Sequence, residues 1–324
     1  MNQKLLKILD NFKNGKILVI GDIMLDKYIW GEVSRISPEA PVQVVNVLKE
    51  TYEAGGAANV ASNVSALSGR AFMVGIAGND EAKNILIDEL QKKGIDTNGI
   101  FIDKDKPTTQ KVRIVGRGQQ LLRVDYEKKE HVHKNIENSI IKFLGKLVKE
   151  VDVVVLSDYA KGVITQEISS QLTRMSKESN KPIVVDPKPK HLNLYSNVTL
   201  ITPNNAEASE MADIEDGYDE AVLEMGSKLL KSLNANVLIT RGEKGMSLFE
   251  KDGSTTHIPA KAKEVYSIIG AGDTVVAVIA LALASGADLK EAATLANIAA
   301  GIKVGKIGTA SVSIDEIKKE IESL

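Results

Sequence analysis

The segment Gly270-Ala271-Gly272-Asp273 sets three small residues and one acid at the start of an apolar run, residues 274–280. The run predicts a helix, and the amides of its first turn have no partners within the helix and carry partial positive charge. Such a helix end binds anions, phosphate above all. Beside a phosphoryl group, Asp273 could accept the proton of an attacking hydroxyl. The alternative is a glycine-capped turn in which Asp273 only favours the helix dipole.

Polar residues also follow the predicted strands at five places. Because open α/β sheets bind ligands at the C-terminal ends of their strands, these residues predict the rim of an active site. Turn residues favour strand ends in any protein, so one such loop alone would carry little weight. The five groups are Gly21, Asp22 and Asp26; residues 157–162; residues 186–188; residues 202–207; and Arg241 with Gly242.

Composition narrows the class of protein. The chain has 324 residues, of which 43% are hydrophobic and 26% charged, as in ordinary globular proteins. A net charge of -2 gives no basic footprint for nucleic acid or anionic membrane. With 0 cysteines, disulfides and thiolate-bound metals are excluded. Apolar runs are too short to span a membrane, so we expect a cytoplasmic protein.

Short β-branched runs alternate with helical patterns along most of the chain. This alternation predicts a doubly wound α/β fold with a mostly parallel sheet and helices on both faces. The predicted strands are 16–20, 72–76, 151–156, 182–185, 198–201 and 237–240, and the predicted helices include 57–67, 82–93, 136–148 and 219–233.

Two stretches, at about residues 28–54 and 99–126, have strand patterns with no helix between the strands. We interpret them as insertions that form one small β-sheet, a lid over a single domain of residues 1–324. A lid excludes water during group transfer. An exposed hairpin at residues 119–123 is the alternative for part of the second stretch.

Several motifs resemble those of the ribokinase-like (PfkB-type) sugar kinases over nearly the whole chain. The general signatures are matched by residues 55–61, Gly-Gly-Ala-Ala-Asn-Val-Ala, and by residues 270–274, Gly-Ala-Gly-Asp-Thr. Within this family the chain looks most like the D-glycero-D-manno-heptose 7-phosphate kinases. The longer matching runs are residues 21–28, 34–41, 119–125 and 157–162.

The resemblance implies a role for each part of the C-terminal signature. Asp273 would be the catalytic base, and the amides of Gly270, Ala271 and Gly272 would form an anion hole. Asn204 and Glu207 would hold Mg²⁺, which prefers oxygen ligands. A helix N-cap with its capping-box glutamate is an alternative for that pair, and both interpretations can hold together.

The resemblance also implies binding residues for two substrates. Those expected on the sugar side are Asp26, Gly55, Gly56, Asn59 and Asp158. Those expected on the ATP side are Asn204, Glu207, Thr240, Gly242, Ala296, Asn297 and Ala300. A phosphate on the sugar needs cations, for which the candidates are Lys161 and Lys188 first, then Arg35 and Arg117.

The chain departs from the family pattern before the anion hole. Ser267 and Ile269 stand where relatives carry an acid and a hydroxyl that help to organise a monovalent-cation site. We therefore doubt activation by K⁺. The chain also ends at Leu324 after a predicted helix, so we expect no C-terminal nucleotidyltransferase domain, to which such kinases are often fused. We expect a homodimer through the lid sheets, by family analogy and from their unpaired edges.

The leading hypothesis is a kinase that phosphorylates the anomeric hydroxyl of the heptose 7-phosphate. The alternatives are a PfkB-type kinase for another sugar phosphate or a nucleoside, and a sugar- or nucleotide-binding protein that has lost catalysis. A dehydrogenase is excluded, because no Gly-x-Gly-x-x-Gly follows the first strand.

Overall fold

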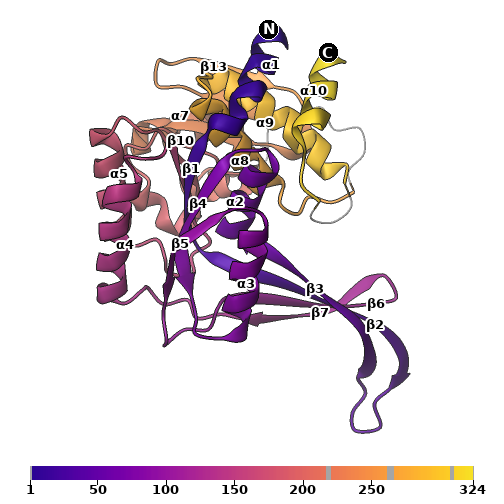
Figure 1. Cartoon of the computed structure of the whole chain (residues 1–324). Helices are drawn as coiled ribbons and strands as arrows, with labels where there is room; N and C mark the ends of the chain where they lie inside the picture. The colour runs from indigo at the N-terminus through magenta and orange to yellow at the C-terminus, as the bar shows by residue number, and fades with distance from the viewer. Residues whose placement is uncertain (1, 217–219, 261–265, 307–309, 324) are drawn as a thin grey trace.

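A nine-stranded sheet forms the body of the protein (Figure 1). The structure is a computed structural model that describes residues 2–216, 220–260, 266–306 and 310–323. The strand order is β13-β12-β11-β10-β9-β8-β1-β4-β5. Pairing is parallel from β11 to β5, while β12 and β13 add antiparallel strands at one edge. The strands are β1 (Lys16–Gly21), β4 (Arg70–Ala77), β5 (Asp96–Ile102), β8 (Val153–Ser157), β9 (Ile183–Asp186), β10 (Leu200–Ile201), β11 (Asn236–Thr240), β12 (Met246–Phe249) and β13 (Thr255–Ile258).

Side chains of the central strands alternate between two hydrophobic cores. In β1, Ile17 and Val19 face one core, while Leu18 and Ile20 face the other. Helices cover both faces, which confirms the predicted doubly wound α/β fold. The first core includes α1 (Asn2–Asn11), α2 (Ala57–Ala66), α3 (Glu81–Lys92), α8 (Ala271–Ala284), α9 (Leu289–Val304) and α10 (Ile314–Glu322). The second includes α4 (Lys134–Leu147), α5 (Gln166–Glu178), α6 (Asn205–Ala212) and α7 (Ala221–Leu233).

Helix α8 is apolar on all sides because it is packed on all sides. It contacts α2, α9 and the strands β1, β8 and β9, and every residue from Asp273 to Ala282 is buried. A helix of this kind belongs in a protein core. Its N-terminus consequently opens at the C-terminal edge of the parallel strands, beside the ends of β8 and β9.

A separate four-stranded sheet projects from the body in Figure 1. Its order is β3-β2-β6-β7, and the parallel pair β2–β6 joins two hairpins. We call this sheet the lid. Its strands are β2 (Ile23–Ile36), β3 (Gln43–Gly56), β6 (Gln110–Gly116) and β7 (Gln119–Tyr126).

The structure moves the start of the second lid insertion from residue 99 to Gln110. Residues 99–102 instead belong to β5, which pairs in parallel with β4. Ile100 packs against the first hydrophobic core, and a Cβ on Gly99 would lie 2.6 Å from the Met73 carbonyl oxygen. Residues 99–102 therefore form a strand as predicted, but packing against the first core makes it part of the nine-stranded sheet and not of the lid.

Most other boundaries agree with the sequence patterns within a few residues. The predicted helix 219–233 begins at Ala221 in the structure, and residue 219 lies outside the described residues. The short antiparallel strands β12 and β13 were not predicted. Among the described helices, none has the length and apolar character needed to cross a membrane.

Gly21 offers a test of how β1 and β8 are packed beside the site. A Cβ at Gly21 would lie 1.9 Å from the Ser157 carbonyl oxygen, whereas one at Gly145 in α4 would lie 3.7 Å from Met175. We expect Gly21→Ala to lower the free energy of unfolding by about 1–3 kcal/mol or more, because the backbone must move. Gly145→Ala is the control and should be neutral or stabilising, by up to about 1 kcal/mol. Urea unfolding of both variants measures this, and equal stabilities would contradict the packing described.

Candidate active site

The N-terminus of α8 is shaped by two glycines with different environments. Gly270 is the N-cap residue and has φ +74°, a conformation that favours glycine. A Cβ on Gly272 would meet no described atom within 4 Å, so this backbone borders open space. The amides of the first turn lack partners within the helix and can bind an anion there. The predicted anion hole of Gly270, Ala271 and Gly272 thus has suitable local geometry.

Asp273 lies in the first turn of α8 and is only 7% exposed. Its Oδ1 accepts a hydrogen bond from the Tyr159 hydroxyl at 2.7 Å, and its Oδ2 accepts one from Asn59 Nδ2 at 2.5 Å. Burial raises the pKa of Asp273, and the bonds from Asn59 and Tyr159 oppose part of that rise. A positioned carboxylate with a raised pKa is a better proton acceptor than an ordinary aspartate.

Tyr159 is a site residue that sequence reasoning did not assign. Burial and then the Asp273 carboxylate hold the pKa of its hydroxyl well above the usual value, so it remains a hydrogen-bond donor. Its place after β8, within the run 157–162 that predicts part of the rim, was the signal, but nothing in the sequence pairs it with Asp273. The contact joins two residues 114 positions apart.

A cavity of about 180 Å³ opens in front of this helix end. It is bounded by residues at or just after the C-terminal ends of β8, β9, β10 and β11 and by the start of α8, as expected for the C-terminal edge of a parallel sheet. The lining residues are Tyr159, Asp186, Lys188, Thr202, Asn204, Glu207, Thr240, Gly270, Gly272, Asp273 and Val275.

Three carboxylates and one ammonium group share this cavity. Burial and the carboxylates of Asp273 and Glu207 hold the pKa of Asp186 well above its usual value. Lys188 pairs with Glu207, and although burial lowers the pKa of Lys188, this partner produces a net rise. The excess of acidic oxygens fits a magnesium ion, which binds carboxylates and phosphates and keeps several waters. Asp186 joins Asn204 and Glu207 as a candidate here; the sequence analysis placed it on the predicted rim but gave it no role in metal binding.

Asn204 and Glu207 form the capping box that was one of their two interpretations. Asn204 Oδ1 accepts from the Glu207 amide at 2.9 Å, and Glu207 Oε2 accepts from the Asn204 amide at 3.1 Å. The box fixes both side chains at the start of α6, at the cavity wall. Capping and metal binding are compatible, because carboxylate oxygens can accept more than one contact.

Of the residues predicted on the sugar side, Asp26, Gly55 and Gly56 meet at the base of the lid. Asp26 pairs with Arg113 at 2.5 Å, and both side chains are largely buried. A Cβ on Gly55 would lie 2.5 Å from Asp26 Oδ2, so glycine here leaves room for that carboxylate. Gly56 has φ +58° and is the N-cap residue of α2, the helix that carries Asn59. Arg113 is a further residue that sequence reasoning did not assign.

The loop after β8 is fixed by Asp22. Its Oδ2 accepts from the amides of Tyr159 and Lys161 at 2.9 and 3.0 Å, and its Oδ1 accepts from the Val163 amide at 3.0 Å. Burial raises the pKa of Asp22 in spite of these bonds. Asp22 therefore positions Tyr159, and through it Asp273.

Asp158 and Lys161, both predicted substrate-binding residues, are engaged within the protein. Asp158 Oδ2 accepts from the Tyr195 hydroxyl at 2.7 Å and contacts His191 Nδ1 at 2.6 Å, and its Oδ1 accepts from the Ala160 amide at 2.7 Å. Lys161 forms an ion pair with Glu127, directly after the lid strand β7. Asp158 thus holds its own loop, whereas Lys161 lies at the junction of lid and body.

Arg35 and Arg117 are not brought to the cavity of their own chain. Arg35 is nine residues beyond Asp26 along β2, about 30 Å at the rise of an extended strand. Arg117 lies between β6 and β7 and donates to the Val33 carbonyl at 2.7 Å. Both are exposed near the far end of the lid.

The residues expected on the ATP side are spread from the cavity to α9. Thr240 lines the cavity, and Gly242 follows it at φ +57° with open space around a Cβ. In α9, Ala296 is fully buried in the first core, Ala300 is half-buried, and Asn297 donates to the Pro259 carbonyl at 2.7 Å. Asn297 thereby secures the chain after β13.

The positions before the anion hole carry no carboxylate in the structure. Ser267 Oγ accepts a hydrogen bond from the Ile269 amide at 3.3 Å, and the Ile269 side chain is 50% exposed. Ser267 therefore braces the turn that leads into Gly270.

Comparisons with known proteins identify the family of the chain. Residues 14–316 match the model of the pfkB family carbohydrate kinases. The bifunctional protein HldE of Desulfatibacillum aliphaticivorans is 42% identical over 96% of this chain and 64% of its own length. HldE of Geobacter metallireducens is 44% identical over 93% of this chain and 61% of its own. The chain thus spans less than two thirds of these relatives.

Solved structures show the same fold. Arabidopsis thaliana ribokinase, complexed with ribose and ATP, has a TM-score of 0.73 and 20% identity, covering 95% of this chain and 98% of its own. The tetrameric inhibited form of Escherichia coli phosphofructokinase-2 has a TM-score of 0.76 and 19% identity, with the same coverage. From the family match and the sequence relatives together, the chain belongs to the pfkB family of carbohydrate kinases.

Proposed function

We propose that this chain uses ATP to phosphorylate the anomeric hydroxyl of D-glycero-D-manno-heptose 7-phosphate, giving the 1,7-bisphosphate. The observation that carries the proposal is the buried Asp273 at the open end of α8, held between Tyr159 and Asn59. The sequence motifs that resemble heptose 7-phosphate kinases, and the similarity to the HldE proteins, support this choice of sugar.

In the proposed reaction Asp273 accepts the proton of the sugar hydroxyl. The hydroxyl oxygen then forms a bond to the γ-phosphorus of ATP as the bond from that phosphorus to the ADP oxygen breaks. The amides of Gly270, Ala271 and Gly272 stabilise the negative charge on the transferring group. The hydrogen bonds from Tyr159 and Asn59 hold the Asp273 carboxylate in position for the sugar hydroxyl. Positioning of this kind supplies much of the catalysis in phosphoryl transfer.

Magnesium is the cofactor that the cavity fits. Asp186 and Glu207 would hold it, with Asn204 at the cavity wall, and the ion would neutralise charge on the ATP phosphates. Lys188 lines the same cavity and can contact the transferring phosphoryl group once the ion competes for Glu207.

A cluster of cations at the lid base supports a substrate that carries its own phosphate. Arg113 and Arg123 are directly opposite in the β6–β7 register, and each is paired with a carboxylate, Arg113 with Asp26 and Arg123 with Asp125. Burial lowers the pKa of Lys111, and the neighbouring Lys161, Arg123 and Arg113 act in the same direction, against Asp26. Lys161 is likewise paired, with Glu127, so a sugar phosphate bound here would take the place of these carboxylates as the partner of the cations.

We also propose a cytoplasmic homodimer that associates through the lids. Large apolar side chains are exposed on the lid, and burial of such a patch against a second copy would be favourable. They are Ile36, Val42, Val47, Leu48, Leu121, Leu122, Val124 and Tyr126.

The substrate is tested by release of ADP with Mg²⁺ and ATP against a panel of acceptors. The panel contains the heptose 7-phosphate, fructose 6-phosphate, ribose, fructose and adenosine. We expect turnover with the heptose phosphate alone. Turnover with another acceptor would replace the substrate and keep the mechanism, whereas ATP binding without any turnover would favour a binding protein.

Asp273→Asn tests the base. We expect kcat to fall about 100-fold or more, because the proton acceptor is lost, while ATP binding and folding are retained. In the unmodified protein, kcat/KM should fall as the pH drops through the raised pKa of Asp273, at a higher pH than for an exposed aspartate. Near-normal turnover of the variant would contradict the assignment.

Glu207→Gln tests the metal site, and Glu210→Gln one turn further along α6 is its matched control, since Glu210 is exposed. Glutamine can preserve the capping box but is a weaker magnesium ligand. We expect about a tenfold rise in the Mg²⁺ concentration for half-maximal rate in Glu207→Gln and no change in Glu210→Gln. Identical Mg²⁺ dependence of both variants would exclude Glu207 as a ligand.

Because Ser267 and Ile269 replace the acid and the hydroxyl of a monovalent-cation site, we expect the rate of phosphoryl transfer to be nearly independent of K⁺. The measurement compares turnover in potassium chloride and tetramethylammonium chloride at equal ionic strength. Several-fold activation by K⁺ would show that other groups complete a monovalent-cation site.

A further inference from the structure

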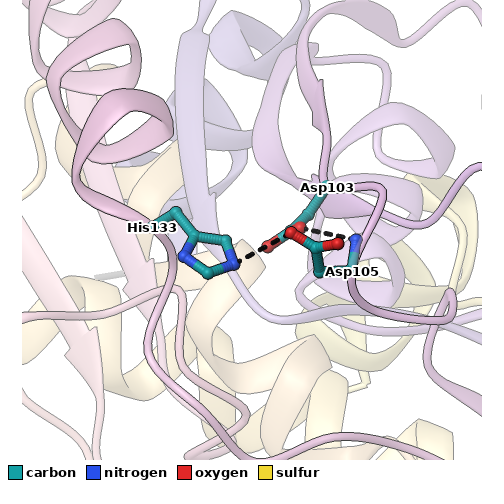
Figure 2. Close-up of side chains that lie close together, drawn as sticks. All are labelled: Asp103, Asp105 and His133. Carbon is teal, nitrogen blue, oxygen red and sulfur yellow. Dashed lines mark hydrogen bonds and ion pairs between the residues drawn. The ribbon is translucent and has the colours of Figure 1, made fainter.

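Asp103, Asp105 and His133 form a cluster outside the cavity (Figure 2). Asp103 and Asp105 lie in the connection from β5 of the body to β6 of the lid, and His133 ends the connection from lid strand β7 to α4. The cluster therefore joins the two chain segments that tie the second lid hairpin to the body. None of the three residues lines the candidate active site.

The ligand atoms of these residues are close enough for one ion. One ligand atom from each residue lies within 4.8 Å of the others, and His133 Nε2 is 3.3 Å from Asp105 Oδ2. Two atoms that each bind Zn²⁺ at about 2.0–2.1 Å with tetrahedral geometry are about 3.3 Å apart. The His133–Asp105 distance already matches that value.

Asp103 supplies a second, independent observation. The residue is 1% exposed, and its Oδ2 has no hydrogen-bond partner among the described residues. Its Oδ1 accepts from the Asp105 amide at 3.0 Å, which leaves the second oxygen unmatched. In Figure 2 the Asp103 carboxylate points toward the His133 ring and the Asp105 carboxylate. A buried carboxylate oxygen without a partner is costly, and a cation would satisfy it.

The neighbouring lysines are bonded elsewhere. Lys106 donates to the Glu130 carbonyl, and Lys128 pairs with the Glu130 carboxylate at 2.9 Å. Their charges lie near Asp103, but neither supplies a hydrogen bond to its free oxygen.

We propose that Asp103, Asp105 and His133 bind a divalent transition-metal ion of the Zn²⁺ type, with water completing its coordination. One imidazole and two carboxylates suit a borderline ion, whereas Mg²⁺ prefers oxygen ligands alone. The bound ion fastens both connections of the second hairpin and stiffens the lid against the body.

Calorimetric titration of the full chain with Zn²⁺, in buffer with excess Mg²⁺ to occupy oxygen-only sites, tests the proposal. We expect one Zn²⁺ site, weakened about tenfold or more in His133→Asn and in Asp105→Asn because a ligand is lost. Both residues are exposed, so these variants should fold. Zn²⁺ should also raise the Tm of the unmodified protein and not that of either variant.

The matched control is His131→Asn, which changes another exposed histidine of the same segment, outside the cluster. It should bind Zn²⁺ as the unmodified protein does. Absence of Zn²⁺ binding in the unmodified protein, or unchanged affinity in His133→Asn, would overturn the proposal. Neither result would bear on the kinase activity proposed above, because the cluster lies outside the cavity.

Discussion

The site depends on one carboxylate held out of water at the end of a buried helix. Removal of a charge from water is unfavourable, and here two hydrogen bonds and the positive end of α8 offset the cost at Asp273. The arrangement requires that α8 be packed on all sides, that Gly270 adopt a positive φ, and that Tyr159 stay in place. Asp22 meets the last requirement by binding three amides of the loop after β8. The residual rise in the pKa of Asp273 would make this carboxylate a better base in the proposed reaction.

The two sides of the site differ in their charged groups. The cavity in front of α8 gathers Asp186, Glu207 and Asp273 around Lys188, which suits a metal ion and the phosphates of ATP. The base of the lid gathers Lys111, Arg113, Arg123 and Lys161, and in the proposed reaction a phosphate on the sugar would compete for them with their present partners Asp26, Asp125 and Glu127. Reaction at Asp273 would then occur between two anions, each neutralised by its own set of groups. The cations at the lid base are the reason that our account prefers a sugar phosphate to an uncharged sugar as the substrate.

The sequence predicted the elements whose pattern is strong and local. The parallel strands, most helices and the small-residue turn before Asp273 follow from periodicity and from glycine. Long-range pairs did not follow, since nothing local links Tyr159 to Asp273 or Arg113 to Asp26. Residues 99–102 have a strand pattern that suits either sheet, and only packing of Ile100 against the core assigns them to the body. Arg35 and Arg117 were predicted from their charge and their position in the sequence, and the length of the lid strands places them far from the cavity.

Phosphorus NMR of the reaction product tests the central claim most directly, because it reports which hydroxyl receives the phosphoryl group. After incubation of the chain with ATP, Mg²⁺ and the heptose 7-phosphate, we predict a second sugar phosphate resonance coupled to the anomeric proton. The resonance of the 7-phosphate should persist beside it. A new phosphate on any other carbon, or no new sugar phosphate while ADP accumulates, would contradict the account.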